Sequence, residues 1–103
     1  MVEIVHGLAG DIAIGLYPLL RDDSCHWLAA DFDGPAAMLD ALAYLKAARA
    51  NGVPAALEVS RSGVGAHAWV FFAGAVPATL ARKLGMGLLR EAMGVRGRMS
   101  LAS

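Results

Sequence analysis

The sequence predicts an α+β fold in which strands and helices follow one another in the order β-β-α-β-β-α. Three observations favour this order. Two pairs of short segments are rich in strand-forming residues. A longer segment with apolar residues at helical spacing follows each pair. Gly, Pro and Asn-Gly signals separate the segments. Helices that follow pairs of strands indicate a sheet with helices packed on one face and a second face left open for binding or catalysis.

The first strand pair is predicted over residues 12–20 and 25–33. "IAIGLYPLL" is rich in strand formers and follows Gly10-Asp11, whereas "RDDS" over residues 21–24 is a turn signal. "CHWLAADFD" then reads as the second strand, so we expect the two segments to form a hairpin.

The first helix is predicted between Gly34-Pro35 and Asn51-Gly52. Proline is favoured in the first turn of a helix, and Asn-Gly is a typical stop signal. Apolar residues within this segment follow helical spacing and should face the sheet: Met38, Leu42, Leu45 and Ala48 or Arg49.

The second strand pair is predicted over residues 53–60 and 66–73, joined by "RSGVG". A turn should follow it, and Pro77 should start the second helix. Gly94 and Gly97 are expected to mark the end of that helix. Its apolar stripe is predicted to consist of Leu80, Leu84, Leu88 and Ala92.

The composition excludes several classes of protein. The chain has 103 residues, which suits a single domain over residues 1–103, and its formal net charge is zero, so charge alone indicates no partner. Cys25 is the only cysteine, which excludes a disulfide framework and a thiolate zinc site and favours a cytoplasmic location. The first residues, "MVEIVHG", lack the basic and apolar regions of a signal peptide, so we expect none there. Residues 62–81 are uncharged but contain Gly and Pro, so we expect no membrane span.

Two carboxylates end the second predicted strand. Because residues i and i+2 of a strand share a face, Asp31 and Asp33 should lie on the side of Trp27 and Ala29, with their backbones about 7 Å apart. Oxygen ligands of this kind suit Mg²⁺ or Mn²⁺, although two carboxylates do not complete a coordination shell. The alternative is that Asp31 caps a turn and Asp33 caps the following helix.

The loop of the second hairpin is rich in hydrogen-bond donors. Its glycines allow close approach of the backbone to a ligand, and its hydroxyl and guanidinium groups suit phosphate oxygens. A histidine follows, with Trp69 and Phe71 on its face. The candidate phosphate-binding residues are Ser60, Arg61, Ser62, Gly63, Gly65 and His67. The alternatives are ordinary turn glycines and a core histidine. Glu58 is either a further metal ligand or an ion-pair partner of Arg61 or Arg82.

The segments "LAADFDG" and "SRSGVGAHAWVFF" together resemble the archaeo-eukaryotic primase superfamily. That family has an Asp-x-Asp on a strand and a Ser/Gly-rich loop that leads into a histidine. Longer stretches, among them "GLYPLLRDDSCHWLAADFDG" and "VPATLARKLGMGLL", look like the primase domain of TOTE conflict systems. These bacterial elements couple a primase-like domain with helicase and nuclease parts. The resemblance covers residues 8–103 and implies a sheet like that of RNA-recognition motifs.

This resemblance implies a catalytic role for Asp31, Asp33 and His67. The two aspartates would bind catalytic Mg²⁺ or Mn²⁺, and His67 would contact the triphosphate of an incoming nucleotide. The donor-rich loop would line the same pocket. The reaction would join a 3′-hydroxyl to the α-phosphate and release pyrophosphate. Implied partners are nucleoside triphosphates, a DNA or RNA template, and fused or associated helicase and nuclease modules.

One element of the family pattern is missing, namely a third acidic residue on a later strand. After Asp33 the acidic residues are Asp40, Glu58 and Glu91, and none occupies such a position. We therefore expect an incomplete catalytic module that is inactive by itself, with an apolar face that its remainder would cover. The alternative is a non-catalytic module that binds nucleic acid on the same sheet. That reading requires exposed aromatic side chains, here Trp27, Trp69 and Phe71.

Overall fold

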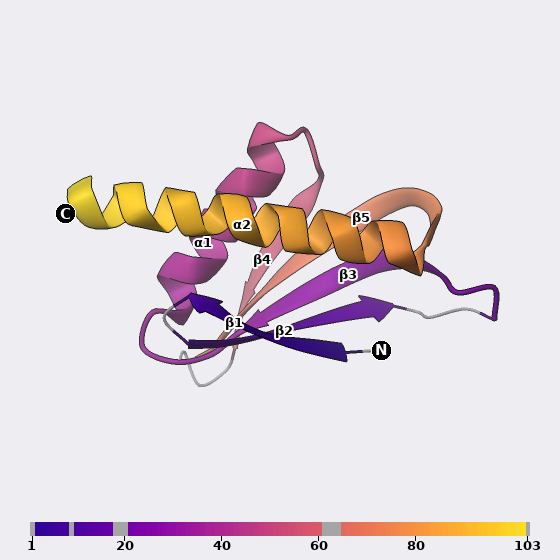
Figure 1. Cartoon of the computed structure of the whole chain (residues 1–103), viewed down its shortest axis with the longest axis horizontal. Helices are drawn as coiled ribbons and strands as arrows, with labels where there is room; N and C mark the ends of the chain where they lie inside the picture. Colours follow the sequence, from indigo (N-terminus) through magenta and orange to yellow (C-terminus); the bar gives the residue numbers. More distant parts are fainter. Residues whose placement is uncertain (1, 9, 18–20, 61–64, 103) are drawn as a thin grey trace.

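The computed structural model describes the backbone of residues 2–8, 10–17, 21–60 and 65–102, and the side chains of residues 12–17, 21–60 and 65–96. The described residues form five strands and two helices (Figure 1). In chain order these are β1 (Val2–Leu8), β2 (Gly10–Tyr17), β3 (Ser24–Phe32), α1 (Ala37–Ala50), β4 (Ala55–Val59), β5 (Ala66–Pro77) and α2 (Ala78–Ala102).

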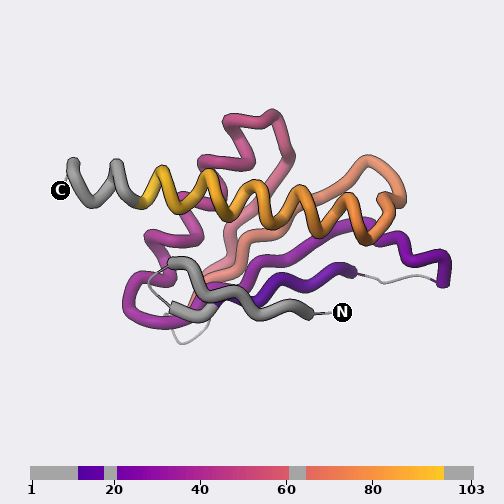
Figure 2. The backbone as a smooth tube through the Cα atoms, viewed as in Figure 1, coloured from indigo at the N-terminus to yellow at the C-terminus, as the bar shows by residue number. Residues whose placement is uncertain are grey.

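The strands form one antiparallel sheet in the order β1-β2-β3-β5-β4, so β3 lies at its centre. Both helices lie on the same side of this sheet and cross one another (Figure 1). Figure 2 shows β3 and β5 running side by side, which matches their pairing from Ser24 opposite Pro77 to Phe32 opposite Ala66. The predicted α+β class and the order β-β-α-β-β-α are confirmed.

Strand β1 precedes the six predicted elements. It pairs with β2 from Val2 opposite Gly15 to Leu8 opposite Gly10, with an irregularity between His6 and Leu8. The sequence pattern gives only a weak signal for it, because Ile4 and Val5 are adjacent and break the alternation typical of a strand. Its backbone pairing with β2 is what defines it as a strand.

The core lies between the sheet and the helices. Leu28, Ala30 and Phe32 of β3 are fully buried there, because residues two apart on a strand share a face. The ring of Phe32 packs edge-on against Tyr44 of α1, with ring centroids 5.7 Å apart. Burial raises the pKa of the Tyr44 hydroxyl, which donates a hydrogen bond to the carbonyl oxygen of Gly85 in α2.

Helix α1 begins at Ala37 and ends at Ala50, with Asn51 and Gly52 after it as predicted. The predicted apolar stripe is partly wrong, because the side chain of Met38 is exposed. The buried face is instead built largely from alanines, and it consists of Ala37, Asp40, Ala41, Ala43, Tyr44, Leu45, Ala47 and Ala48. In a helix this rich in alanine, the positions of the larger apolar residues do not define the buried face.

The junction of β5 and α2 also differs from the prediction. No turn separates them within the described residues. The strand continues through Gly74 to Pro77, because Val76 and Pro77 pair with Cys25 and Ser24 of β3. The backbone N–H of Ala78 then donates to the carbonyl oxygen of Asp23, at 2.6 Å, where the helix starts.

Helix α2 is longer than predicted and does not end at Gly94 or Gly97. Leu80, a predicted core position, is exposed, whereas Leu88 and Ala92 are buried as expected. Beyond Gly94 the helix is held by an ion pair with α1. The guanidinium Nε of Arg96 donates to the carboxylate Oδ1 of Asp40 at 2.7 Å.

No helix in the described parts of the chain is both long enough and apolar enough to span a membrane. Within residues 62–81, residues 66–77 form β5 and residues 78–81 form the start of α2.

We predict that Asp40→Ala lowers the free energy of unfolding by about 3 kcal/mol. The Asp40 carboxylate is almost fully buried, and its removal leaves the largely buried Arg96 guanidinium without this partner. Urea denaturation followed by circular dichroism measures the change. The double variant Asp40→Met, Arg96→Met should recover most of the loss, because an apolar pair of similar volume replaces a buried ion pair at little cost. Equal losses in the single and double variants would contradict this role.

Candidate functional site

The face of the sheet opposite the helices carries side chains in rows, because residues two apart on each strand share a side. Strand register aligns Ala13 of β2 with Asp31 of β3, Asp31 with His67 of β5, and His67 with Glu58 of β4. Two carboxylates therefore flank one imidazole across three neighbouring strands. We call Asp31, His67 and Glu58 the polar row.

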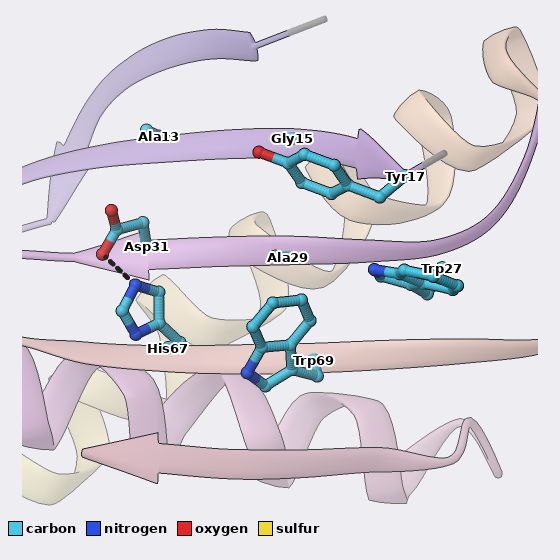
Figure 3. Close-up of a pocket in the computed structure, with 8 residues that line it drawn as sticks. All are labelled: Ala13, Gly15, Tyr17, Trp27, Ala29, Asp31, His67 and Trp69. Carbon is cyan, nitrogen blue, oxygen red and sulfur yellow. Dashed lines mark ion pairs between the residues drawn. The ribbon is translucent and has the colours of Figure 1, made fainter. Parts of the chain in front are cut away.

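The polar row is held together by contacts to His67. The imidazole Nε2 lies 3.1 Å from Asp31 Oδ1 (Figure 3). On the other side of the ring, Nδ1 lies 3.7 Å from Glu58 Oε1. The Nδ1 atom is buried and forms no hydrogen bond within the described residues. The side chains of Asp31 and Glu58 are 45% and 62% exposed, so a ligand can reach both carboxylates.

These positions contradict two of the simpler interpretations, namely the capping roles of Asp31 and Asp33 and a core position for His67. Asp31 lies within β3 and not in a turn, and α1 has no side-chain cap, so Asp33 does not cap it. His67 lies on the open face with 31% of its side chain exposed, so it is not a core histidine. Glu58 contacts His67, whereas its predicted partner Arg61 lies outside the described residues.

Asp33 lies where β3 ends, directly over Gly65. A Cβ atom added to Gly65 would be 3.0 Å from Asp33 Oδ1 and 3.3 Å from the carbonyl oxygen of Phe32. Glycine at this position thus leaves room for the Asp33 carboxylate on the backbone that leads into His67. The three predicted residues Asp31, Asp33 and His67 are consequently brought to one end of the open face.

Ser60 closes the base of the donor-rich loop. Its backbone N–H donates to the carbonyl oxygen of Gly65 at 2.9 Å, and its hydroxyl oxygen accepts from the Gly65 N–H at 3.0 Å. Both residues therefore stand beside Asp33. The other predicted phosphate-binding residues, Arg61, Ser62 and Gly63, lie outside the described residues.

A pocket of about 380 Å³ adjoins the polar row on the open face (Figure 3). Asp31 and His67 form one end of it, and the rest is lined by aromatic side chains together with small residues. Its lining consists of Ala13, Gly15, Tyr17, Trp27, Ala29, Asp31, His67 and Trp69. Sequence reasoning did not assign Gly15 and Tyr17 to a site. Alternation along β2, combined with the register to β3, is the signal that places them there.

Two other ionisable groups lie away from this site. A hydrogen bond from the Ser24 hydroxyl lowers the pKa of Asp22, which is exposed in the turn before β3. Burial raises the pKa of the Cys25 thiol, which is enclosed in the core. Neither group faces the polar row.

The site contains some of the ligand groups that a hard divalent cation needs. Carboxylate oxygens are preferred ligands of Mg²⁺ and Mn²⁺, and Asp31 and Asp33 present them at an accessible end of the sheet. Among the residues that the structure describes, no group of three or more His, Cys, Asp or Glu side chains is placed to hold a metal ion. A cation at Asp31 and Asp33 would need further ligands, such as water or phosphate oxygens.

Comparison with known families matches residues 2–103 to the family described as TOTE conflict system, Archaeo-Eukaryotic Primase domain. No curated protein and no solved structure matches the chain. The match includes β3, the β4–β5 hairpin and both helices.

We predict that Gly65→Ala displaces the Asp33 carboxylate while costing about 1 kcal/mol or less of unfolding free energy. The added Cβ would lie closer to the exposed Asp33 carboxylate, at 3.0 Å, than to the backbone oxygen of Phe32, at 3.3 Å. The carboxyl ¹³C chemical shift of Asp33 should change, whereas Gly74→Ala, which meets nothing within 4 Å, should leave it unchanged. An unchanged Asp33 signal in Gly65→Ala would contradict the placement of this carboxylate.

Proposed function

The chain belongs to the archaeo-eukaryotic primase family of TOTE conflict systems, and from this premise we propose that its open face binds a metal–nucleoside triphosphate complex for nucleotidyl transfer. The observation that carries the proposal is the alignment of Asp31 with His67, with Asp33 next to them at the hairpin base. The two carboxylates can serve as cation ligands, and the accessible imidazole beside them can donate a hydrogen bond to a phosphate group.

Asp31 and Asp33 are the residues that would hold Mg²⁺ or Mn²⁺. The cation would neutralise charge on the phosphate oxygens and help to stabilise the displacement at phosphorus. Both carboxylates are accessible, and neither has a structural partner in α1. Their side chains can therefore take up a ligand without disturbing the core.

His67 would donate a hydrogen bond to the triphosphate. Glu58 lies at its Nδ1 side and Asp31 at its Nε2 side, so the imidazole is oriented along the polar row. A cation bound by both Asp31 and the phosphate would bring phosphate oxygens close to Nε2 of His67 on the open face of the sheet. Binding of the triphosphate would then replace the contact between Asp31 and His67.

The donor-rich loop would complete the phosphate site. Gly65 and Ser60 lie at its base, next to Asp33, and the family resemblance assigns Arg61, Ser62 and Gly63 to the same pocket. Arginine suits phosphate because its guanidinium donates paired hydrogen bonds. Because Gly65 has no side chain, a phosphate group can approach its backbone closely.

The proposed reaction is a displacement at the α-phosphorus. The oxygen of a strand's 3′-hydroxyl forms a bond to this phosphorus, the bond to the bridging oxygen breaks, and pyrophosphate leaves while the hydroxyl proton passes to solvent. The strand would be paired to a DNA or RNA template, and helicase and nuclease modules would act with the domain. Further acidic ligands would have to join Asp31 and Asp33 for full activity.

A second candidate is a module that binds single-stranded nucleic acid without catalysis. It is favoured by the aromatic side chains on the open face, since Trp27 and Trp69 are partly exposed and Phe71 is 46% exposed. Such binding would need neither Asp31 nor Asp33. Dependence on a divalent cation therefore separates the two functions.

Isothermal titration with ATP and dATP in Mn²⁺ tests the proposal. We predict that the variants Asp31→Asn and Asp33→Asn weaken binding at least about tenfold, because each loses a charged ligand. Asp22→Asn is the matched control, since this exposed carboxylate lies at the other end of β3 and should not affect binding.

Two results would contradict the proposed function. One is nucleotide binding that is equally tight in EDTA and in Mn²⁺. The other is retention of Mn²⁺-dependent binding when both Asp31 and Asp33 are replaced by Asn. Binding of single strands that is independent of metal, without binding of nucleoside triphosphates, would favour the second candidate.

A further inference from the structure

The pocket beside the polar row has a floor of small residues. Gly15 of β2 aligns with Ala29 of β3, and Ala29 aligns with Trp69 of β5. The next row along the strands aligns Tyr17 with Trp27. Small side chains in the middle of the face thus leave a depression with aromatic rings around it and Asp31 and His67 at one end (Figure 3).

Tyr17 lies across Gly15 instead of pointing away from the sheet. A Cβ atom added to Gly15 would be 2.5 Å from the ring carbon Cε2 and from the hydroxyl oxygen of Tyr17 (Figure 3). Only glycine leaves space for this position of the ring. Tyr17 as a whole residue is 40% exposed, and its ring offers a flat apolar surface at the rim of the pocket.

We propose that this pocket binds the base of a single nucleotide by stacking on Tyr17, Trp27 and Trp69. The inference rests on the proposed function in one respect: it takes the flat ring in the pocket to be a nucleobase. A base stacks on aromatic side chains whatever its sequence identity, because every base has a π-face. The volume of the pocket is at the lower end of the range for small-molecule sites, which fits one base and not a run of them.

The spacing along the strands connects this pocket to the phosphate end. Rows on one face are about 7 Å apart, so Trp27 lies about 13 Å along β3 from Asp31. A nucleotide whose phosphates lie near Asp31 and His67 would place its sugar over Ala29 and its base between the aromatic side chains. Two chemically different ends of one pocket therefore match the two ends of one nucleotide.

The charges around the pocket favour a single nucleotide over a strand. Among the residues that the structure describes, the eight that line the pocket include Asp31 and no lysine or arginine. Proteins that bind single strands track the phosphate backbone with a positively charged groove. Here a phosphate would instead be accepted at one end only, where a cation and His67 offset the carboxylate charge.

Tryptophan fluorescence, titrated with adenosine in EDTA, tests the base site without phosphate or metal. We expect saturable quenching by adenosine and none by ribose 5-phosphate, which lacks a base. Tyr17→Leu should weaken adenosine binding at least about fivefold, and Tyr17→Phe should not, because stacking needs the ring but not the hydroxyl. Gly15→Ala should also weaken binding, because it displaces the Tyr17 ring without removing it.

Phe71→Leu is the matched control for these variants. Phe71 is exposed on the same face and aligns with Trp27, but it does not line the pocket, so adenosine binding should be unchanged. Thermal unfolding followed by circular dichroism identifies any variant that fails to fold. Tyr17→Phe and Tyr17→Leu change the same position. Weaker adenosine binding in Tyr17→Leu alone would therefore report the loss of stacking and not a loss of folding.

Three outcomes would overturn the base site. They are an absence of saturable quenching by adenosine, equal binding by Tyr17→Leu and the wild type, and binding of a tetradeoxyadenylate strand without binding of adenosine. The adenosine titration contains neither a phosphate group nor a free divalent cation. Failure of the metal-dependent phosphate site is therefore measured separately from failure of the base site.

Discussion

The two-residue period of β3 is the constraint on which the rest of the structure depends. Leu28, Ala30 and Phe32 are fully buried under the helices, and this burial sets the register of the central strand. A slip of one residue would bring Asp31 into the core and expose Phe32. Burial of the carboxylate and exposure of the aromatic ring would both reduce the free energy of unfolding. Packing on one face of the sheet thereby determines that Asp31 stands opposite His67 on the other.

The open face then divides into chemically distinct ends. The polar row presents two carboxylates and an imidazole across β3, β5 and β4, and Asp33 extends it at the hairpin base. The aromatic end begins one row away, where glycine and alanine leave a depression bounded by larger rings. A sheet with helices on one side only can present both ends to the same ligand. This is the physical basis for proposing that the chain binds a nucleotide.

Much of this arrangement could be predicted from the sequence, because it follows from alternation. The shared face of Asp31 with Trp27, and of His67 with Trp69, needs only the strand period. The pocket needed more, since Tyr17 and Gly15 join it through the pairing of β2 with β3, which no local pattern reveals. The buried face of α1 and the extent of α2 were harder to predict, for another reason. Alanine-rich α1 gives no clear apolar stripe. Helix α2 continues past Gly94, and no local pattern reveals that Arg96 there pairs with Asp40 of α1.

Paramagnetic broadening by Mn²⁺ tests most directly whether Asp31 and Asp33 hold the nucleotide's cation. In ¹⁵N-labelled protein with ATP, substoichiometric Mn²⁺ should selectively remove the amide signals of Asp31, Asp33 and Gly65, because relaxation by the ion falls steeply with distance. Signals from the turn that contains Asp22, which carries another exposed carboxylate, should persist. Broadening centred on that turn, or spread evenly over the exposed acidic residues, would contradict a cation site at the end of β3.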